Sequence, residues 1–309
     1  MKVCRLSKPP QRKSLLFIND DAALNQRYRS GLMRLAAAEG FAVHSDGLFT
    51  AGRVNWRLLV RLISQPPLVV VSNLRANLVL LAFWWVRGLV IVNGLGRHRG
   101  RRLFRGVLVV LVRANRRKAL AVQSYADYRY LRRFADHERC HWVPGSGGTL
   151  KPIGGGDAVI VLVQRDDKIA LVSRSARAGL AAMAAHANNC LRLDIVGCRN
   201  AVAHLFSGCD VRSLGFLPAD QILASGSLFL QPSGYGEGFP HSLADAIVSD
   251  MTLLIARREF LRYGLGRLGA AFTSIGHGWG VVDPSESLKS AVAEGTVSAR
   301  YLQLIDQKG

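Results

Sequence analysis

The stretch LFLQPSGYGEGFPHSLAD, residues 228–245, carries most of the information about fold and site in this sequence. A short apolar run ends in a loop with three glycines, and the chain then enters a helix predicted to begin near Pro240. Such a loop presents backbone N–H groups at a helix N-terminus, where an anion can bind. Two carboxylates, Glu237 and Asp245, flank this place. Because carboxylates repel phosphate, we expect hydroxyl groups to be their partners.

Apolar runs of strand length alternate with segments of helical periodicity along most of the chain. The predicted strands are 14–18, 41–44, 68–71, 89–92, 119–122, 158–163, 168–172, 191–196, 211–216, 228–231 and 252–256. The predicted helices are 24–36, 56–63, 76–86, 103–113, 125–134, 179–187, 218–224 and 240–248, with further helix after 278. This alternation predicts an α/β protein with doubly wound parallel sheets, whose ligands bind at the carboxyl ends of the strands.

The chain has 309 residues, which is longer than a usual single domain. A Pro/Gly-rich segment at 142–148 resembles a crossover and continues as a linker to residue 156. We therefore predict two Rossmann-like domains, 1–148 and 149–309, facing each other across a cleft.

Positive charge is concentrated in the first half of the chain. Residues 1–148 contain 26 Lys and Arg against 7 Asp and Glu, whereas residues 149–309 contain 15 against 14. This asymmetry predicts that the first domain faces a polyanion, either an anionic membrane surface or nucleic acid. Basic residues around the apolar helix at 103–113, with tryptophans in the same domain, favour the membrane. The sequence contains neither an RNP-like motif nor a helix-turn-helix signature.

Cysteine usage and the apolar segments indicate a cytoplasmic protein. The cysteines are Cys4, Cys140, Cys190, Cys198 and Cys209. Their odd number and the lack of any C-x-x-C pair predict a reduced protein. The segment 1–13 lacks the apolar core of a signal peptide, and the run 78–92 is interrupted by Arg87 and Gly88.

The segment PSGYGEGFPHSLADA at 232–246 resembles the P-S-x-x-E-G-F-P-x-x-x-x-E-A motif of the retaining glycosyltransferases of family 4. Three other segments are similar to parts of that family: VPGSG at 143–147, NGLG at 93–96, and FIND at 17–20 with Arg27 and Arg29 in the next helix. The resemblance covers most of the chain in the right order. It implies the GT-B arrangement of two Rossmann-like domains and transfer of a sugar from a nucleotide donor with retention.

The resemblance also assigns site residues. It gives Glu237 the donor sugar and Asp245 the ribose, although the family has a longer glutamate at the second position. For the diphosphate it gives Arg174 and, across a one-residue gap, Arg177, while Arg165 and Lys168 offer a rival pair nearby. The remaining donor-binding candidates are Gly236, Gly238, Phe239, Asn93, Gly94, Gly96 and Ser146. His98 and His241 beside these loops are candidates for a general base.

The expected partners are a nucleotide-sugar donor, with UDP as the first choice, and a lipid-linked or oligosaccharide acceptor of bacterial surface polysaccharide synthesis. We expect no cofactor and no metal, because arginines can neutralise the diphosphate and the sequence has no D-x-D motif. The expected location is the cytoplasmic face of the membrane, bound peripherally through the basic domain. The alternatives are a UDP-sugar epimerase of the same architecture, a nucleic-acid-binding protein with a Rossmann-like core, and an inactive transferase.

Overall fold

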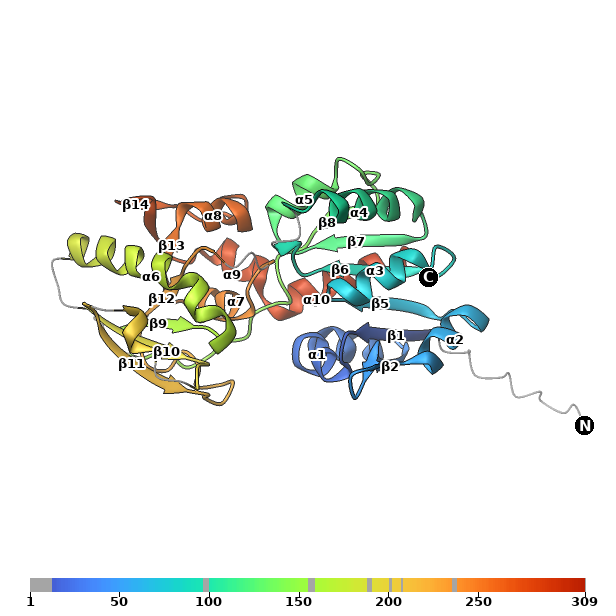
Figure 1. Ribbon diagram of the computed structural model, residues 1–309, viewed down its shortest axis with the longest axis horizontal. Helices are drawn as coiled ribbons and strands as arrows, with labels where there is room; N and C mark the ends of the chain where they lie inside the picture. Colours follow the sequence, from blue (N-terminus) through green and yellow to red (C-terminus); the bar gives the residue numbers. More distant parts are fainter. Residues whose placement is uncertain are drawn as a thin grey trace, which may run out of the picture.

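The computed structural model of the chain describes residues 13–96, 100–154, 159–187, 191–199, 202–206, 208–234 and 238–308. Helices and strands within these ranges form two α/β halves that lie side by side along the long axis of the molecule (Figure 1). Each half contains one main sheet. The predicted α/β class is therefore confirmed.

The sheet of the first half is entirely parallel, with the strand order β2-β1-β5-β6-β7-β8. Its strands are β1 (Ser14–Asn19), β2 (Ala42–Gly47), β5 (Leu68–Ser72), β6 (Gly88–Val92), β7 (Lys118–Val122) and β8 (Cys140–Trp142). A small hairpin, β3 (Phe49–Thr50) with β4 (Arg53–Val54), follows β2. The central strands β5, β6 and β7 are apolar without alternation because both faces of the sheet are covered.

Helices cover both faces of this sheet. They are α1 (Ala22–Ala38), α2 (Trp56–Ser64), α3 (Leu74–Ala82), α4 (Arg102–Ala114) and α5 (Tyr125–Leu131). The buried side chains of α2, α3 and α4 form one core with one set of strand residues, while α1 packs against the other set. Asp21 caps the N-terminus of α1, where its Oδ1 accepts from Ala23 N at 3.0 Å.

The sheet of the second half has the order β11-β10-β9-β12-β13-β15-β14, and it is parallel except for the pairings of β15 with β13 and with β14, which are antiparallel. Its strands are β9 (Val159–Val163), β10 (Arg192–Val196), β11 (Asp210–Gly215), β12 (Leu228–Gln231), β13 (Thr252–Ala256), β14 (Thr273–Gly276) and β15 (Trp279–Val282). Its helices are α6 (Asp166–Ala187), α7 (His241–Val248), α8 (Arg257–Tyr263) and α9 (Glu286–Val292), with the 3-10 turns η2 (Ala203–Phe206) and η3 (Leu265–Leu268). Helix α6 covers one face, and α7, α8 and α9 cover the other.

Two predicted elements of this half are wrong. The segment 168–172 is not a strand but part of α6, which runs without a break to Ala187. Its buried residues Ile169, Val172 and Ala176 recur at helical spacing and pack on the sheet, so the apolar run belongs to a helix face. The predicted helix at 218–224 consists of turns.

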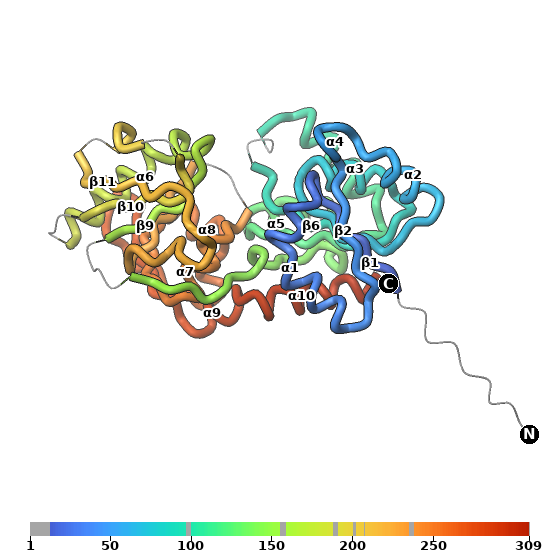
Figure 2. Tube along the Cα trace, turned by 90° about the horizontal axis from the view of Figure 1, so that it is seen from below, coloured from blue at the N-terminus to red at the C-terminus, as the bar shows by residue number. Residues whose placement is uncertain are grey.

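Helix α10 (Glu294–Asp306) follows α9 but packs against the first sheet. Val297, Tyr301 and Ile305 are fully or almost fully buried beside strand residues such as Phe17 and Ile91. Figure 2 shows α10 lying along α1, with the C-terminus beside the first half. The chain therefore crosses between the halves twice, once near Gly148 and once near Glu294, where Glu294 N donates to Gly148 O at 2.9 Å.

In the part of the chain that the structure describes, none of the helices combines the length and the apolar character needed to cross a bilayer.

The packing of α10 predicts that this helix stabilises the first half. Ile305→Ala removes a fully buried side chain, and we expect the free energy of unfolding to fall by about 2–5 kcal/mol in urea denaturation. The control is Gln303→Ala on the exposed side of the same helix, with an expected change within about 0.5 kcal/mol. If both variants change the free energy of unfolding by the same small amount, the burial of Ile305 against the first half does not contribute to stability.

Candidate active site

Each sheet has a topological switch point, where the connections that leave two neighbouring strands run in opposite directions. In the second sheet this point lies between β9 and β12, so residues 164–168 after β9 and 232–234 after β12 border one crevice. In the first sheet it lies between β1 and β5, which end at Asn19 and Ser72. Ligands of doubly wound sheets bind at such points.

The loop after β12 bridges the two halves. A Cβ on Gly238 would lie 1.5 Å from the backbone oxygen of Asn93 at the end of β6, so only glycine permits this close approach. Phe239 is buried, packs against the Tyr263 ring at 5.4 Å between centroids and lies against Gly145 of the crossover. Gly238 and Phe239 thus anchor the loop after β12 to Asn93 of the first half, to the crossover and to the core of the second half. Gly236 and Glu237 lie outside the described residues.

Asp245 is a buried carboxylate on α7. Its Oδ1 accepts from Thr149 N at 2.8 Å and from Thr149 Oγ1 at 3.3 Å, directly after the crossover. Its Oδ2 lies 3.9 Å from His241 Nε2. His241 in turn meets the Tyr28 ring edge-on at 6.0 Å. The carboxylate therefore holds the crossover onto α7, and its contact with a ribose stays a prediction.

A chain of side-chain amides lines the carboxyl ends of β1, β5 and β6. Asn73 Nδ2 donates to Asn19 Oδ1 at 2.6 Å, and Asn93 Nδ2 donates to Asn73 Oδ1 at 2.7 Å. Asn19 also donates to Ser72 Oγ at 2.9 Å and to Asn25 Oδ1 at 3.2 Å. Asn73 has a φ of 75°, which residues other than glycine rarely adopt. These bonds fix the side chains of three loops that meet at the switch point of the first sheet.

Arg29 of α1 connects this amide chain to the crossover. Its Nη2 donates to Asn93 Oδ1 at 2.7 Å and its Nη1 donates to Ser146 Oγ at 2.8 Å, while the guanidinium lies 5.6 Å from the centre of the Tyr301 ring. The residue is only 3 % exposed, and burial lowers the pKa of its guanidinium. Arg29 Nε has no hydrogen-bond partner among the described residues.

Gln123 and Tyr301 complete the same buried group. Gln123 Nε2 donates to Ser146 Oγ and to Tyr301 Oη, each at 3.3 Å, and Tyr301 Oη donates to Gly145 O. Ser146 thus accepts from Arg29 and Gln123, so its hydroxyl is held in place at the crossover.

Gly94 and Gly96 form a turn after β6 with φ values of 152° and 53°. Between them, Leu95 N donates to Asp127 Oδ2 at 3.1 Å, and Leu95 itself is buried. The positive φ values explain why glycine occupies both positions. Their amides as donor ligands stay a prediction.

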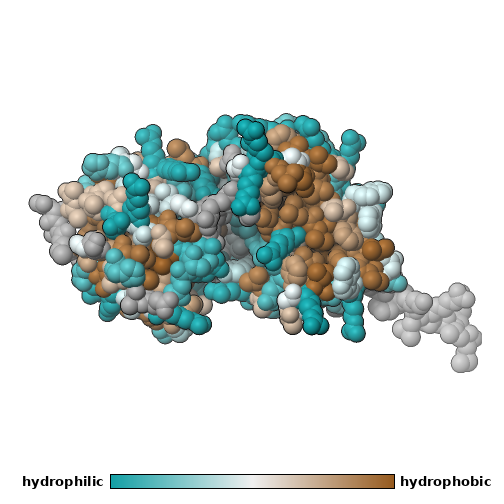
Figure 3. Space-filling model, in the orientation of Figure 1, coloured by the Kyte–Doolittle hydropathy of each residue, from teal (hydrophilic) through white to brown (hydrophobic). Residues whose placement is uncertain are grey.

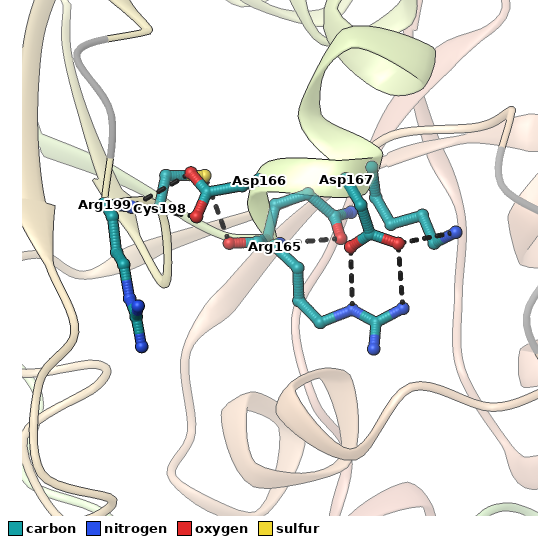
Figure 4. Close-up of polar contacts among 7 residues, drawn as sticks. Arg165, Asp166, Asp167, Cys198 and Arg199 are labelled. Carbon is teal, nitrogen blue, oxygen red and sulfur yellow. Dashed lines mark hydrogen bonds and ion pairs between the residues drawn. The ribbon is translucent and has the colours of Figure 1, made fainter. Parts of the chain in front are cut away.

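Arg174 and Arg177 do not follow a strand, as the sequence predicted, but lie in the interior of α6 with exposed side chains. The rival pair lies where the sheet topology favours a ligand. Arg165 lies two residues after the end of β9 (Figure 4). Lys168 lies in the first turn of α6. Asp167 holds both cations, with Lys168 Nζ at 2.8 Å from its Oδ2 and Arg165 Nε at 3.3 Å from its Oδ1. The hydrogen bond from Lys168 lowers the pKa of Asp167.

The neighbouring carboxylate, Asp166, has a different role. Its two oxygens accept from Arg199 N at 3.0 and 3.2 Å, which ties the start of α6 to the loop after β10 (Figure 4). Cys198 Sγ donates to Gln164 O at 3.3 Å in the same place. These contacts fix the backbone from Gln164 to Asp166.

Sequence reasoning did not find Gln123 and Tyr301 as members of the site. The sequence does indicate Asn19 and Asn73 as site residues, because Asn19 ends one apolar strand and Asn73 follows another at the ligand-binding edge of the sheet. It does not indicate Tyr301, because this residue reaches the site only through the return of α10 to the first half. His98, a further candidate, lies outside the described residues.

No group of three or more His, Cys, Asp or Glu side chains that could hold a metal ion occurs within the described residues.

Known proteins resemble this chain in fold but not in sequence. No protein-family model and no curated protein sequence matches the chain. A glycosyltransferase from Rickettsia africae has 8% identity and a TM-score of 0.59, over 96% of this chain and 98% of that one. HepE from Anabaena, solved with UDP and glucose, has 14% identity and a TM-score of 0.57, over 96% and 97%. The GtfA/B complex has 14% identity and a TM-score of 0.51, over 84% and 64%.

These likenesses show the fold of the chain. It is that of glycosyltransferases with two Rossmann-like domains, the GT-B arrangement that the sequence predicted.

The contact between Gly238 and Asn93 predicts that no side chain is tolerated at position 238. Gly238→Ala places a Cβ against a backbone oxygen, and we expect the free energy of unfolding to fall by about 1–3 kcal/mol. Gly295→Ala on α10 is the matched control, because its Cβ would meet nothing within 4 Å. Urea denaturation of both variants checks this, and an unchanged stability of Gly238→Ala would mean that the loop does not rest on Asn93.

Proposed function

We propose that the protein transfers a sugar from a nucleotide diphosphate donor, with UDP as the nucleotide, to an acceptor of bacterial surface polysaccharide synthesis. The proposal rests on the position of Arg165 and Lys168 after β9, beside the switch point with β12, the strand from which the 232–246 motif continues. The glycosyltransferase fold supports the reaction class. The complex of HepE with UDP and glucose supports the choice of nucleotide.

Arg165 and Lys168 are the residues we propose for the diphosphate. Negative charge grows on the leaving diphosphate as the bond to the anomeric carbon breaks, so fixed positive charge beside it lowers the barrier. Asp167 holds both side chains and limits their motion. Arg174 and Arg177 point from the interior of α6 and are the weaker candidates.

The carboxylates then take the hydroxyl groups of the donor. We propose Glu237 for the sugar and Asp245 for the ribose, with Gly236, Gly238 and Phe239 shaping the loop between them. Asn93, Gly94, Gly96 and Ser146 would approach the donor from the first half. Retention of anomeric configuration and independence of a metal complete the proposal, and they rest on the resemblance of the motif to family 4.

The first half also carries a surface suited to an anionic membrane. Helix α2 exposes Trp56, Val60 and Ile63, and α4 exposes Leu103, Val107 and Val110, in both cases at the spacing i, i+4, i+7. The opposite faces of both helices are buried in one core, so these apolar stripes lie on the same side of the sheet. The exposed arginines of this surface are Arg53, Arg57, Arg61, Arg101, Arg102, Arg105 and Arg113.

Figure 3 shows apolar residues gathered over the first half and bordered by hydrophilic side chains. Apolar side chains that enter the interface between headgroups and acyl chains, flanked by arginines that meet anionic headgroups, are typical of peripheral membrane helices. We therefore propose peripheral binding to the cytoplasmic face of the membrane. A lipid-linked acceptor would be reached there, whereas an oligosaccharide acceptor would not require it.

The cationic pair gives a test of the donor site. Isothermal calorimetry with UDP should show binding that weakens at least about 10-fold in Arg165→Gln/Lys168→Gln, because each charge-assisted hydrogen bond contributes about 1.5–3 kcal/mol. Arg174→Gln/Arg177→Gln, which makes the same charge change, should bind like the wild type. The reverse result would restore Arg174 and Arg177 as the diphosphate ligands, and no UDP binding by the wild type would contradict the choice of nucleotide.

Glu237→Ala tests the sugar assignment. We expect transfer from the nucleotide sugar to fall by at least about 100-fold, with UDP affinity and melting temperature unchanged, since the carboxylate is assigned to the sugar and not to the nucleotide. Near wild-type transfer by this variant would contradict the proposed role.

Vesicle flotation tests the membrane surface. We expect binding to anionic vesicles that weakens with salt, and a loss of at least about 10-fold in the variant with Trp56, Ile63, Leu103 and Val110 changed to Ser. Leu150→Ser/Phe216→Ser removes exposed apolar side chains elsewhere and serves as control. Equal affinity for neutral vesicles, or equal binding of both variants, would contradict the proposal.

A further inference from the structure

A cavity of about 860 Å³ lies between α5 of the first half and α8 of the second. Gly96 from the turn after β6 and Gly234 from the loop after β12 line it as well, so it opens beside both candidate loops of the cleft. No residue from 164 to 168 contributes to its wall. The cavity wall therefore shares no residue with the cationic pair that we assign to the donor diphosphate.

Four arginines line this cavity: Arg129, Arg258, Arg262 and Arg267. Arg129 comes from the first half and the other three from the second, so their charges converge from both sides of the cleft. Arg129, Arg258 and Arg267 are exposed to the solvent of the cavity. Arg267 lies 4.6 Å from the centre of the Tyr125 ring, which orients its guanidinium along the wall.

The two carboxylates of the wall do not cancel this charge. Asp127 is buried and accepts from Leu95 N. Glu259 is 2 % exposed, its Oε2 lies 3.7 Å from Arg262 Nη1, and burial raises the pKa of its carboxyl group. Arg262 pairs with Glu259, and Arg258 also acts on that carboxylate electrostatically, while within the described residues Arg129 and Arg267 form no ion pair with a carboxylate. The cavity retains an excess of positive charge.

We propose that this cavity binds the diphosphate group of the acceptor, which would make the acceptor a lipid diphosphate and not a neutral oligosaccharide. The inference rests on the proposed transferase function and specifies its second substrate. Converging guanidinium groups suit a diphosphate, because each can offer two parallel N–H donors to phosphate oxygens. The volume is also in the range of ligand pockets and leaves room for the first sugar. Both halves must contribute, so acceptor binding would favour the arrangement in which the cleft is formed.

Calorimetry of the full chain with inorganic pyrophosphate and farnesyl diphosphate, each with and without saturating UDP, tests this inference. We expect both probes to bind the UDP-saturated protein and to compete with each other. In Arg258→Gln/Arg267→Gln both should bind at least about 10-fold more weakly, with UDP affinity unchanged. Arg133→Gln/Arg300→Gln removes the same charge from exposed positions outside the cavity and should bind the probes like the wild type.

Three results would overturn the inference. One is an unchanged probe affinity in Arg258→Gln/Arg267→Gln. Another is competition of UDP with pyrophosphate together with loss of UDP binding in that variant, which would assign the cavity to the donor. The third is binding of pyrophosphate without farnesyl diphosphate, which would exclude a lipid diphosphate. If UDP fails to bind at all, the proposed donor is wrong, while the probe titrations without UDP still decide on the cavity.

Discussion

The buried guanidinium of Arg29 is the interaction on which the arrangement of the cleft depends. A buried charge is costly unless hydrogen bonds replace its hydration, and here Asn93 and Ser146 accept from it while the Tyr301 ring lies beneath it. These partners come from the end of β6, the crossover and α10. Loss of any one of these segments would remove one partner of the buried charge, so Arg29 couples α1 to both crossings between the halves.

The two crossings of the chain between the halves are held by buried contacts. The crossover is held by Asp245 through Thr149, and α10 is held by the apolar core that it shares with the first sheet. Away from these crossings the halves also meet where Gly238 lies on Asn93, where His241 meets Tyr28, and where α5 faces α8 beside the arginine-lined cavity. Side chains that we assign to substrate therefore lie beside segments fixed by buried contacts, which limits the reorganisation needed when a ligand binds.

Sequence alone predicted most of the strands and the α/β architecture, because apolar runs such as 89–92 and 119–122 are short and bounded by turn residues. The strand predicted at 168–172 is wrong, because this apolar run belongs to one face of a long helix. The run is too short to distinguish a strand from one face of a helix by its length. The same prediction placed Arg174 and Arg177 just after a strand, whereas both lie in the interior of α6. The roles of Tyr301 and Gln123 could not be predicted, since they depend on a contact between residues 178 positions apart in the chain. Glu237 and Gly236 remain assignments from the motif alone.

A crystal structure of the protein with bound UDP tests the central claim most directly. We predict that the diphosphate binds at the switch point between β9 and β12, with its oxygens within hydrogen-bonding distance of Arg165 or Lys168 and the ribose on the side of α7. A diphosphate bound along the interior of α6 at Arg174 and Arg177, or in the cavity between α5 and α8, would contradict it.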